Sequence, residues 1–337
     1  MVTSSVINFD DFGLNAGQEA RIANGYSGFN WSQAGVYSPD GSLPGYTATS
    51  GGTLAFIAEA GNLDVAGYED AAAGSPFVMS REKPFDLLSA DLSAAFRNGL
   101  SVTVTAYADE AGTISLGTTT FDLSQGAQSV AFDQTLFTGA RRIEFNSNDG
   151  NASTLDYFGI DNLTVRDTVT VVNFDDIALL SGGESAVADG YAGFNWSGVG
   201  AYNPDGAIAG YDATTGSNIG FIAEAGGIEI AGYESHEAGT AAVITRDSAF
   251  TFVGGDFSAA FRNDLALTVR AFSDVEGNTL VGTAQLVINQ GATSFSFADG
   301  VNVEGSFANI SRLEFASNDG NASTIDYFGF DQLMFVI

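Results

Sequence analysis

The chain of 337 residues contains one long internal duplication. Three motifs recur at one constant spacing, and a fourth recurs at a slightly longer spacing, so we expect a five-residue insertion within 289–308 of the second copy. This period is too long for a solenoid repeat, so each copy should be a whole domain. We predict two domains, 1–166 and 167–337, with a short join at 165–169. The motifs are NFDD (8–11, 173–176), GFNWS (28–32, 193–197), SAAFRN (93–98, 258–263) and SNDGNAST (147–154, 317–324).

The apolar pattern within a copy has the period of a strand. Residues 100–107 alternate and place Leu100, Val102, Val104 and Ala106 on one face. Hydrophobic residues form 45% of the chain, enough for two cores, and 42 glycines against 5 prolines indicate many tight turns. We therefore predict an all-β fold of two tandem antiparallel β-sandwich (jelly-roll) domains, with about eight to ten strands in each copy.

The charge of the chain is strongly negative. There are 41 acidic and 11 basic residues, a formal net charge of −30, and acidic residues dominate in both copies. Such a surface repels nucleic acid and anionic membranes and attracts cations, above all Ca²⁺. We predict no nucleic-acid partner.

Several functional classes are excluded by what the sequence lacks. It has no cysteine and a single histidine, His236, which excludes disulfides, thiolate metal sites and multi-histidine zinc sites. No apolar run approaches the roughly 20 residues that span a bilayer, so membrane insertion is not expected. The start at 1–5 has neither the basic nor the apolar region of a signal peptide. We expect an extracellular or cell-surface location, reached after removal of a leader or by type I secretion.

The motifs together resemble bacterial exoprotein modules over nearly all of each copy. The opening NFDD, the GFNWS segment, the run at 85–92, the alternating strand at 100–107 and the closing FGID are similar to jelly-roll modules of PEP-CTERM-type surface proteins. The chain lacks their Pro-Glu-Pro sorting tail. It is more distantly similar to galactose-binding-like carbohydrate-binding modules. That resemblance implies a structural Ca²⁺ near the paired first and last strands, and a glycan on a sheet face or on edge loops.

Acidic residues occur at the ends of the first and last predicted strands of each copy. If those strands pair, as in a jelly roll, their carboxylates converge, and Ca²⁺ requires six to eight oxygen ligands. The alternative is a set of solvated strand ends and turns. The predicted metal ligands are Asp10, Asp11 and Asp161, with Asp175, Asp176 and Asp331 in the second copy. The Asn-Asp-Gly segments at 148–150 and 318–320 are predicted to be hairpin turns.

Aromatic residues supply the candidates for sugar stacking. Trp31 and Trp196 share a strand face with a phenylalanine, a pattern typical of the core. Tyrosines on turn-rich segments are better candidates, because an exposed tyrosine offers a flat apolar face and a hydroxyl. The predicted ligand-binding tyrosines are Tyr37, Tyr46 and Tyr68, with Tyr202, Tyr211 and Tyr233.

The remaining candidates are charged. Glu59 and Glu69, repeated as Glu224 and Glu234, could form the carboxylate pair of a glycoside hydrolase, but glutamates flanking a hairpin are the simpler interpretation. Arg97 and Arg262, in the repeated Phe-Arg-Asn, are either a fork for a carboxylated sugar or structural partners of an acid, and we favour the second. The ligand-binding set is completed by Glu69, Arg97, Glu234 and Arg262.

Two classes of function fit this sequence, and neither is enzymatic. The first is an extracellular or cell-surface protein with two Ca-stabilised modules that bind glycans or mediate adhesion. The second is a self-assembling structural protein of a surface layer, fibre or matrix. A glycoside hydrolase is a more distant third. The expected partners are glycans or copies of the chain itself.

Overall fold

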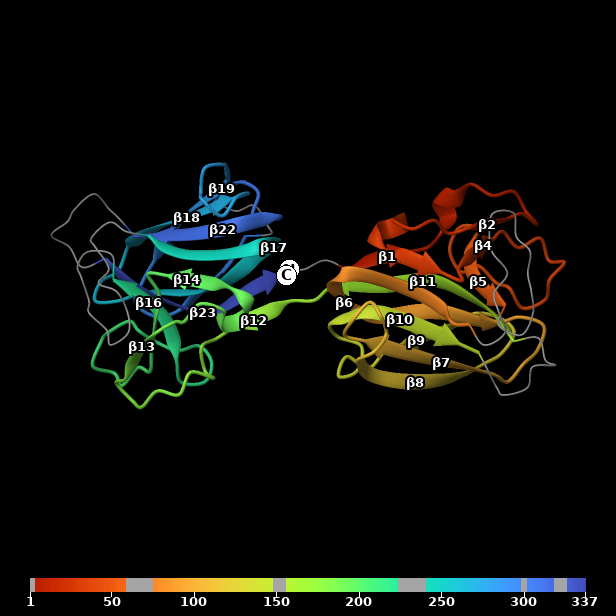
Figure 1. Cartoon of the computed structure of the whole chain (residues 1–337), viewed down its shortest axis with the longest axis horizontal. Helices are drawn as coiled ribbons and strands as arrows, with labels where there is room; N and C mark the ends of the chain where they lie inside the picture. Colours follow the sequence, from red (N-terminus) through yellow and green to blue (C-terminus); the bar gives the residue numbers. More distant parts are fainter. Residues whose placement is uncertain (1–3, 59–74, 148–155, 224–240, 298–301, 318–325) are drawn as a thin grey trace. The chain divides into compact units, whose positions relative to one another are not determined.

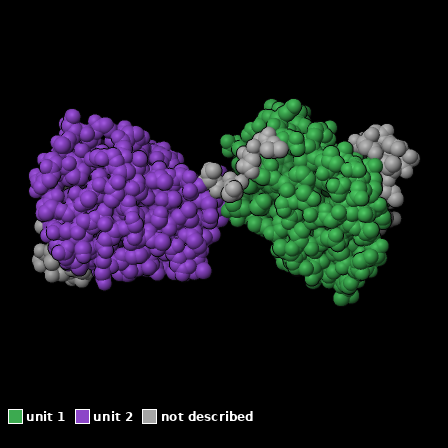
Figure 2. All heavy atoms as spheres, turned by 180° about the vertical axis from the view of Figure 1, so that it is seen from behind, with its two compact units in different colours: residues 1–2, 169–337 green, residues 3–168 purple. Residues whose placement is uncertain are grey.

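The computed structural model describes residues 4–58, 75–147, 156–223, 241–297, 302–317 and 326–337. The chain divides into two compact units after Thr168, two residues beyond the predicted boundary (Figure 2). Each unit is built almost entirely from antiparallel strands (Figure 1), which confirms the predicted fold class. Within the described ranges the helices are three short 3-10 turns, η1 (Asp10–Phe12), η2 (Tyr26–Gly28) and η3 (Tyr191–Gly193).

The first domain is a sandwich whose two layers share one long strand, β6. The second half of β6 pairs with β11 in the layer β2-β4-β5-β11, and its first half pairs with β10 in the layer β10-β7-β8. The first and last strands pair, with Val6 opposite Thr164, as predicted. The strands are β1 (Ser5–Ile7), β2 (Glu19–Arg21), β3 (Asn30–Ser32), β4 (Gly35–Tyr37), β5 (Leu54–Ala58), β6 (Phe77–Ala94), β7 (Leu100–Tyr107), β8 (Ser115–Leu123), β9 (Gln128–Ala131), β10 (Ala140–Asn146) and β11 (Tyr157–Asp167).

The second domain repeats this topology around β17 and adds one strand. β20 follows β9 at the constant spacing of the first three motifs, whereas β22 follows β10 at the longer spacing of the fourth. The insertion therefore falls between β20 and β22, within the predicted stretch, and β21 lies there. The strands are β12 (Thr170–Val172), β13 (Glu184–Ala186), β14 (Asn195–Ser197), β15 (Gly200–Tyr202), β16 (Ile219–Ala223), β17 (Ala242–Ala259), β18 (Leu265–Phe272), β19 (Leu280–Ile288), β20 (Thr293–Ser296), β21 (Val303–Gly305), β22 (Ile310–Ala316) and β23 (Tyr327–Val336).

A large apolar core lies between the layers of each domain. The inward residues of β7 are buried, which confirms the alternation predicted for 100–107. Trp31 and Trp196 are buried in the two cores, as predicted. Among the residues that the structure describes, no helix is long and apolar enough to cross a membrane.

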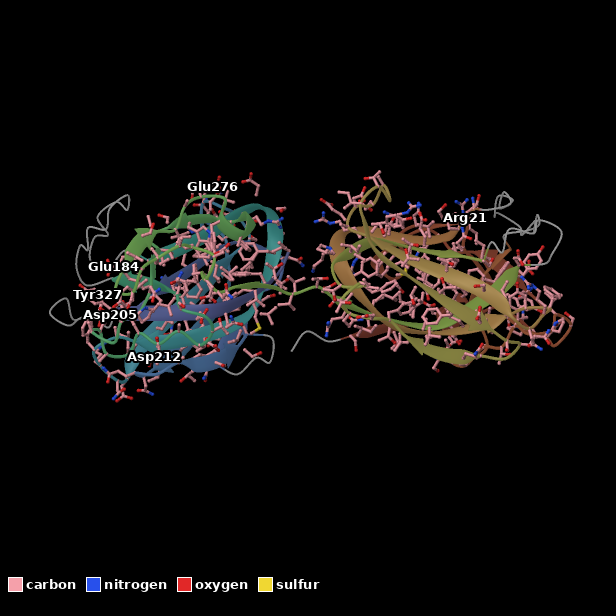
Figure 3. The ribbon with its side chains drawn as sticks, turned by 90° about the horizontal axis from the view of Figure 1, so that it is seen from below. Arg21, Glu184, Asp205, Asp212, Glu276 and Tyr327 are labelled. Carbon is pink, nitrogen blue, oxygen red and sulfur yellow. The ribbon has the colours of Figure 1, made fainter. Side chains whose placement is uncertain are left out.

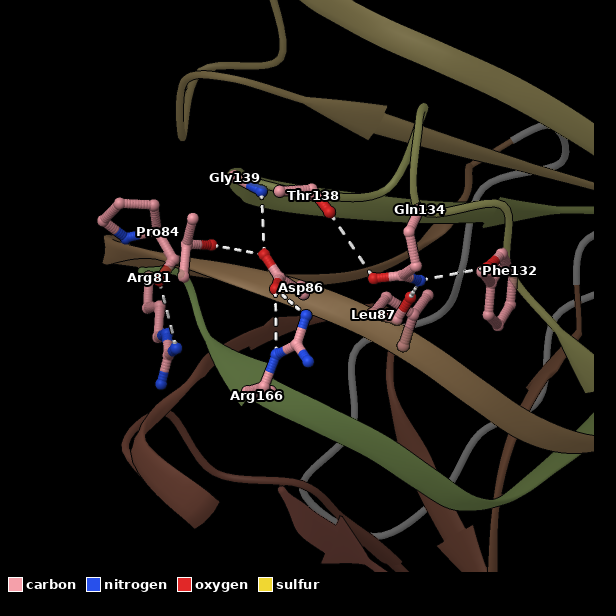
Figure 4. Close-up of polar contacts among 10 residues, drawn as sticks. Arg81, Pro84, Asp86, Leu87, Phe132, Gln134, Thr138, Gly139 and Arg166 are labelled. Carbon is pink, nitrogen blue, oxygen red and sulfur yellow. Dashed lines mark hydrogen bonds and ion pairs between the residues drawn. The ribbon is translucent and has the colours of Figure 1, made fainter. Parts of the chain in front are cut away.

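A polar cluster around Asp86 connects β6 with the last residues of the first domain (Figure 4). The buried carboxylate of Asp86 accepts hydrogen bonds from Arg166 Nη2 at 2.7 Å, Thr168 Oγ1 at 2.5 Å and the Gly139 amide at 3.1 Å. Position 251, which corresponds to Asp86 in the second copy, is a threonine. The cluster is thus specific to the first domain and binds the chain as it leaves β11.

We expect Asp86→Asn to lower the free energy of unfolding of the first domain by about 2 kcal/mol, because the partly exposed Arg166 loses its charged acceptor and the buried site loses a strong hydrogen-bond acceptor. Thr251→Ala, at the equivalent position of the second domain, should have little effect. Hydrogen exchange resolved by peptide in increasing urea reports each domain separately. Equal destabilisation of both domains by Asp86→Asn would contradict this assignment.

Candidate functional site

The predicted calcium ligand Asp161 is instead the acceptor for a loop. Its carboxylate is buried and accepts hydrogen bonds from the amides of Thr49 at 2.8 Å and Ser50 at 2.9 Å, and from the hydroxyls of both residues. Its other oxygen accepts from the Asn162 amide at 2.7 Å. This set of donors satisfies an anion without a metal ion.

Asp10 and Asp11 have similar structural roles. Asp10 accepts hydrogen bonds from the amides of Gly52 at 2.9 Å and Thr53 at 3.3 Å, and Asp11 accepts from the Tyr26 hydroxyl at 2.7 Å. Asp10 and Asp161 therefore hold neighbouring parts of one loop, 49–53. The close approach of Asp10 to the loop backbone requires Gly51, because a Cβ there would lie 2.0 Å from a carboxylate oxygen.

The second domain uses its three aspartates in the same way. Asp331 accepts from the amides of Thr214 and Thr215, Asp175 accepts from those of Ser217 and Asn218, and Asp176 accepts from the Tyr191 hydroxyl. Within the described part of the chain, no three acidic, histidine or cysteine residues are grouped so that they could hold a metal ion. In each of the six residues at least one carboxylate oxygen accepts an amide or hydroxyl proton, so each aspartate has a structural partner within the protein, and Ca²⁺ binding here stays a prediction.

Four of the six tyrosines predicted to be exposed lie in the described residues, and all four are buried. Tyr37 and Tyr46 are 2% and 7% exposed, and Tyr202 and Tyr211 are 3% and 4% exposed. The prediction was wrong because β4 and β15 are buried over their whole length, and the turn-rich segments that follow them pack onto the sheet. The structure does bring the predicted residues together: the ring centroids are 5.5 Å apart for Tyr37 and Tyr46, and 5.8 Å apart for Tyr202 and Tyr211.

The two predicted arginines each form an ion pair with a buried aspartate. Arg97 Nη2 lies 2.5 Å from Asp156 Oδ1, and Arg262 Nη2 lies 2.8 Å from Asp326 Oδ1. Both aspartate side chains are at most 5% exposed, whereas both arginine side chains are 28% exposed. The structural-partner interpretation is confirmed, and each arginine side chain remains partly exposed.

An aromatic residue with an unusual backbone precedes each arginine. Phe96 and Phe261 have φ of +62° and +64°, a region that is rare for bulky side chains and costs about 1–3 kcal/mol. Each conformation is held by a hydrogen bond from the phenylalanine amide, to Pro44 O and Ala209 O respectively, both at 2.9 Å. The conformation recurs in both copies, as it does at the buried Phe9 and Phe174, but the Phe96 and Phe261 rings are not fully buried.

The same phenylalanines connect the arginine pairs to the tyrosine clusters. The Phe96 ring lies 5.5 Å from that of Tyr157 and 6.2 Å from that of Tyr46, and Phe261 lies 5.8 Å from Tyr327. We call the four residues Phe-Arg-Asp-Tyr the aromatic-arginine site. It comprises Phe96, Arg97, Asp156 and Tyr157 in the first domain, and Phe261, Arg262, Asp326 and Tyr327 in the second.

The site is more open in the second domain. Phe261 is 45% exposed, whereas Phe96 is half-buried, and Tyr327 is likewise less buried than Tyr157. Figure 3 shows Tyr327 with Glu184 and Asp205 at one end of this domain. Asp205 accepts a hydrogen bond from the Tyr202 hydroxyl at 2.9 Å. The second copy thus has an exposed aromatic ring, a partly exposed arginine side chain and exposed carboxylates at the same end.

Sequence reasoning identified the arginines but not the other members of the site. Asp156 and Tyr157 recur as Asp326 and Tyr327 in the same Asp-Tyr-Phe-Gly segment, and this repeat was the available signal. His236 and the two Asn-Asp-Gly segments lie outside the described residues. The same is true of six residues predicted to bind a ligand or to be catalytic, namely Glu59, Tyr68, Glu69, Glu224, Tyr233 and Glu234.

Glu19 lies beside the tyrosine cluster, opposite Tyr37 in the β2–β4 pair. Burial raises the pKa of its carboxyl above 4.5. The carboxyl of Glu19 therefore binds a proton more tightly in the folded domain than in the unfolded chain. Ionisation of Glu19 lowers the stability of the domain, and this loss is complete above the folded pKa and absent below the unfolded pKa. We expect Glu19→Gln to raise the urea midpoint of the first domain at pH 7, with no difference at about pH 4. The exposed Glu82→Gln is the control, and an equal rise there would contradict the assignment.

Comparison with known proteins gives likeness of fold only. No protein-family profile and no curated protein matches the chain. The K2 cleaved adhesin domain of Lys-gingipain is 12% identical and covers 50% of this chain and 98% of its own, with a TM-score of 0.32. A mutant family 29 carbohydrate-binding module is 18% identical and covers 49% and 92%, with a TM-score of 0.27. Tandem CBM51 modules of a family 98 glycoside hydrolase from Streptococcus pneumoniae are 9% identical and cover 99% of both chains, with a TM-score of 0.27. At these values the likeness carries no functional argument, so function must be argued from the site.

Proposed function

We propose that each domain is a non-enzymatic binding module that takes a neutral glycan at its aromatic-arginine site. The observation that carries this proposal is the repetition, at the same end of both sandwiches, of a strained phenylalanine beside an arginine held by a buried aspartate. In the second domain the phenylalanine ring is 45% exposed, although a ring of this size is usually buried.

The chemistry of the site suits a sugar ring. An exposed aromatic face packs against the apolar C–H face of a pyranose, while guanidinium N–H groups donate to its hydroxyls. The ion pair fixes the guanidinium before binding, so less side-chain entropy is lost when a ligand is bound. A net charge of −30 disfavours sialylated, uronic or sulfated glycans, and this leaves neutral hexoses as the preferred class.

Duplication gives this proposal a functional reason. Two linked sites bind a multivalent surface more tightly than either site alone, because the second contact is made at high effective concentration. Weak single sites would therefore suffice for adhesion to a glycan-rich surface, and an extracellular or cell-surface location follows from this role.

The proposal is tested on an array of neutral and acidic glycans. We expect binding to neutral glycans, and we expect Phe261→Ala to weaken it at least about tenfold, since the stacking face is lost. The control is Leu180→Ala, which truncates a side chain that is 86% exposed in the same domain. If no glycan binds, or if Phe261→Ala and Leu180→Ala bind equally well, the site is misassigned.

A further inference from the structure

The two domains differ at one sheet edge. In the second domain β19 pairs with β18 on one side and with the inserted strand β21 on the other, where Thr283 lies opposite Glu304. In the first domain β8 pairs with β7, and no described segment pairs with its other side. Figure 1 shows β8 at the edge of its sheet.

The second domain shows which backbone groups point outward at this edge. Val281 O accepts a hydrogen bond from Ser306 N at 2.8 Å, and Gln285 N donates to Asn302 O at 3.3 Å. The corresponding residues of β8, at the constant spacing of the repeat, are Leu116 and Thr120. Because outward groups alternate along a strand, Thr118 points the same way. β8 thus offers the same donors and acceptors that β19 uses to hold β21.

The edge of β8 lacks the charges and prolines that usually protect an edge strand from strand addition. It has one irregularity, at Leu116, but β19 has the same irregularity at Val281 and still pairs with β21. Residues 113–121 are uncharged, in a chain with 41 acidic and 11 basic residues. Ile114 and Leu116 are 60% and 36% exposed. This segment favours pairing with another uncharged strand.

We propose that β8 pairs antiparallel with β8 of a second copy of this chain, about a twofold axis at Thr119. This register is centred on the regular part of β8 that follows the irregularity at Leu116, and it places the outward-facing Thr118 and Thr120 of the two copies opposite each other. Asp122, the one charged residue of β8, then faces Leu116 of the other copy and not a second aspartate. Pairing of two copies of β8 in this register therefore places no two like charges opposite each other.

Threonine hydroxyls support the same register. Thr103 and Thr120 hydroxyls are 3.2 Å apart across β7 and β8, and those of Thr105 and Thr118 are 3.1 Å apart. In the proposed pair the two rows become continuous across the dimer axis, and threonine pairs stabilise adjacent strands. The equivalent edge of β19 is already occupied by β21, so we assign pairing to the first domain.

The test is the mass of the full chain by analytical ultracentrifugation across the micromolar range. We expect a monomer–dimer equilibrium that strengthens with added salt, because two chains of charge −30 repel each other. Hydrogen exchange should show the amides of Leu116, Thr118 and Thr120 protected only at high concentration. A monomer at every concentration, with unchanged exchange at these amides, would overturn the proposal.

Variants locate the contact. Thr120→Pro removes an outward amide and should weaken dimerisation at least about tenfold, since each dimer loses two hydrogen bonds. Thr120→Val keeps the amide and should dimerise as the parent does. If Thr120→Pro unfolds the first domain, Leu116→Lys with Thr118→Lys replaces it. Unchanged dimerisation in a folded Thr120→Pro variant, or in the folded double lysine variant, would refute the β8 contact. Phe261→Ala should leave dimerisation intact, which separates this inference from the glycan site.

Discussion

Asp161→Ala is expected to lower the free energy of unfolding of the first domain by about 3–5 kcal/mol. The buried carboxylate accepts three backbone amide protons, from Thr49, Ser50 and Asn162, and alanine leaves all three without an acceptor. Ala48 and Leu54, which flank the loop 49–53, belong to the cluster that contains Tyr46, so release of the loop should loosen this cluster.

Urea unfolding followed by hydrogen exchange measures this loss in each domain. Asp331→Ala should destabilise the second domain to a similar extent, and the exposed Asp122→Ala should change little. Because backbone amides already donate to these carboxylates, we expect EDTA to leave the melting temperature of the parent unchanged. A rise in melting temperature with Ca²⁺ that Asp161→Ala abolishes would reinstate the predicted calcium ligand and contradict our assignment.

The second large effect is expected at the Arg262–Asp326 pair. Arg262→Met removes the ion-pair partner of a buried aspartate and should destabilise the second domain by about 2–3 kcal/mol, somewhat less than a fully buried pair because the arginine is partly exposed. It should also abolish glycan binding at this site, since the guanidinium donors are lost. Peptide-resolved hydrogen exchange and the glycan array measure the two effects.

A double variant separates the two roles of this arginine. Replacing both partners, as Arg262→Met with Asp326→Leu, should restore most of the stability, because a buried pair can be exchanged for apolar packing at little cost. Glycan binding should remain lost. Recovery of binding in the double variant would show that the arginine acts only through the fold.

The parts of this molecule that depend on local pattern could be predicted from the sequence. The duplication, the pairing of first and last strands, the insertion and the buried Trp31 and Trp196 all follow from spacing and alternation. The burial of Tyr37 and Tyr46 could not be predicted from the sequence, because it depends on how the segment after β4 packs onto the sheet. A turn-rich composition indicates irregular backbone but not which face that backbone covers.

The hydrogen-bond partners of the aspartates could not be predicted either, for a related reason. Their convergence was expected from the topology, and Asp10 and Asp161 do bind one loop. The hydrogen-bond donors to these carboxylates, however, include backbone amides of the loop 49–53, which lies far from Asp161 in the sequence. An acidic pair does not reveal whether its oxygens accept protons from the backbone or bind a cation. Likewise, the positive φ of Phe96 and Phe261 has no signature in the sequence.

Isothermal titration of the full chain with a neutral oligosaccharide identified on the array tests the central claim most directly. Two equivalent modules predict two binding sites per chain, reduced to one by Phe261→Ala, with the remaining site removed by adding Phe96→Ala. Stoichiometry that stays at two in Phe261→Ala, or binding that survives both substitutions in a folded chain, would contradict the assignment of function to the aromatic-arginine sites.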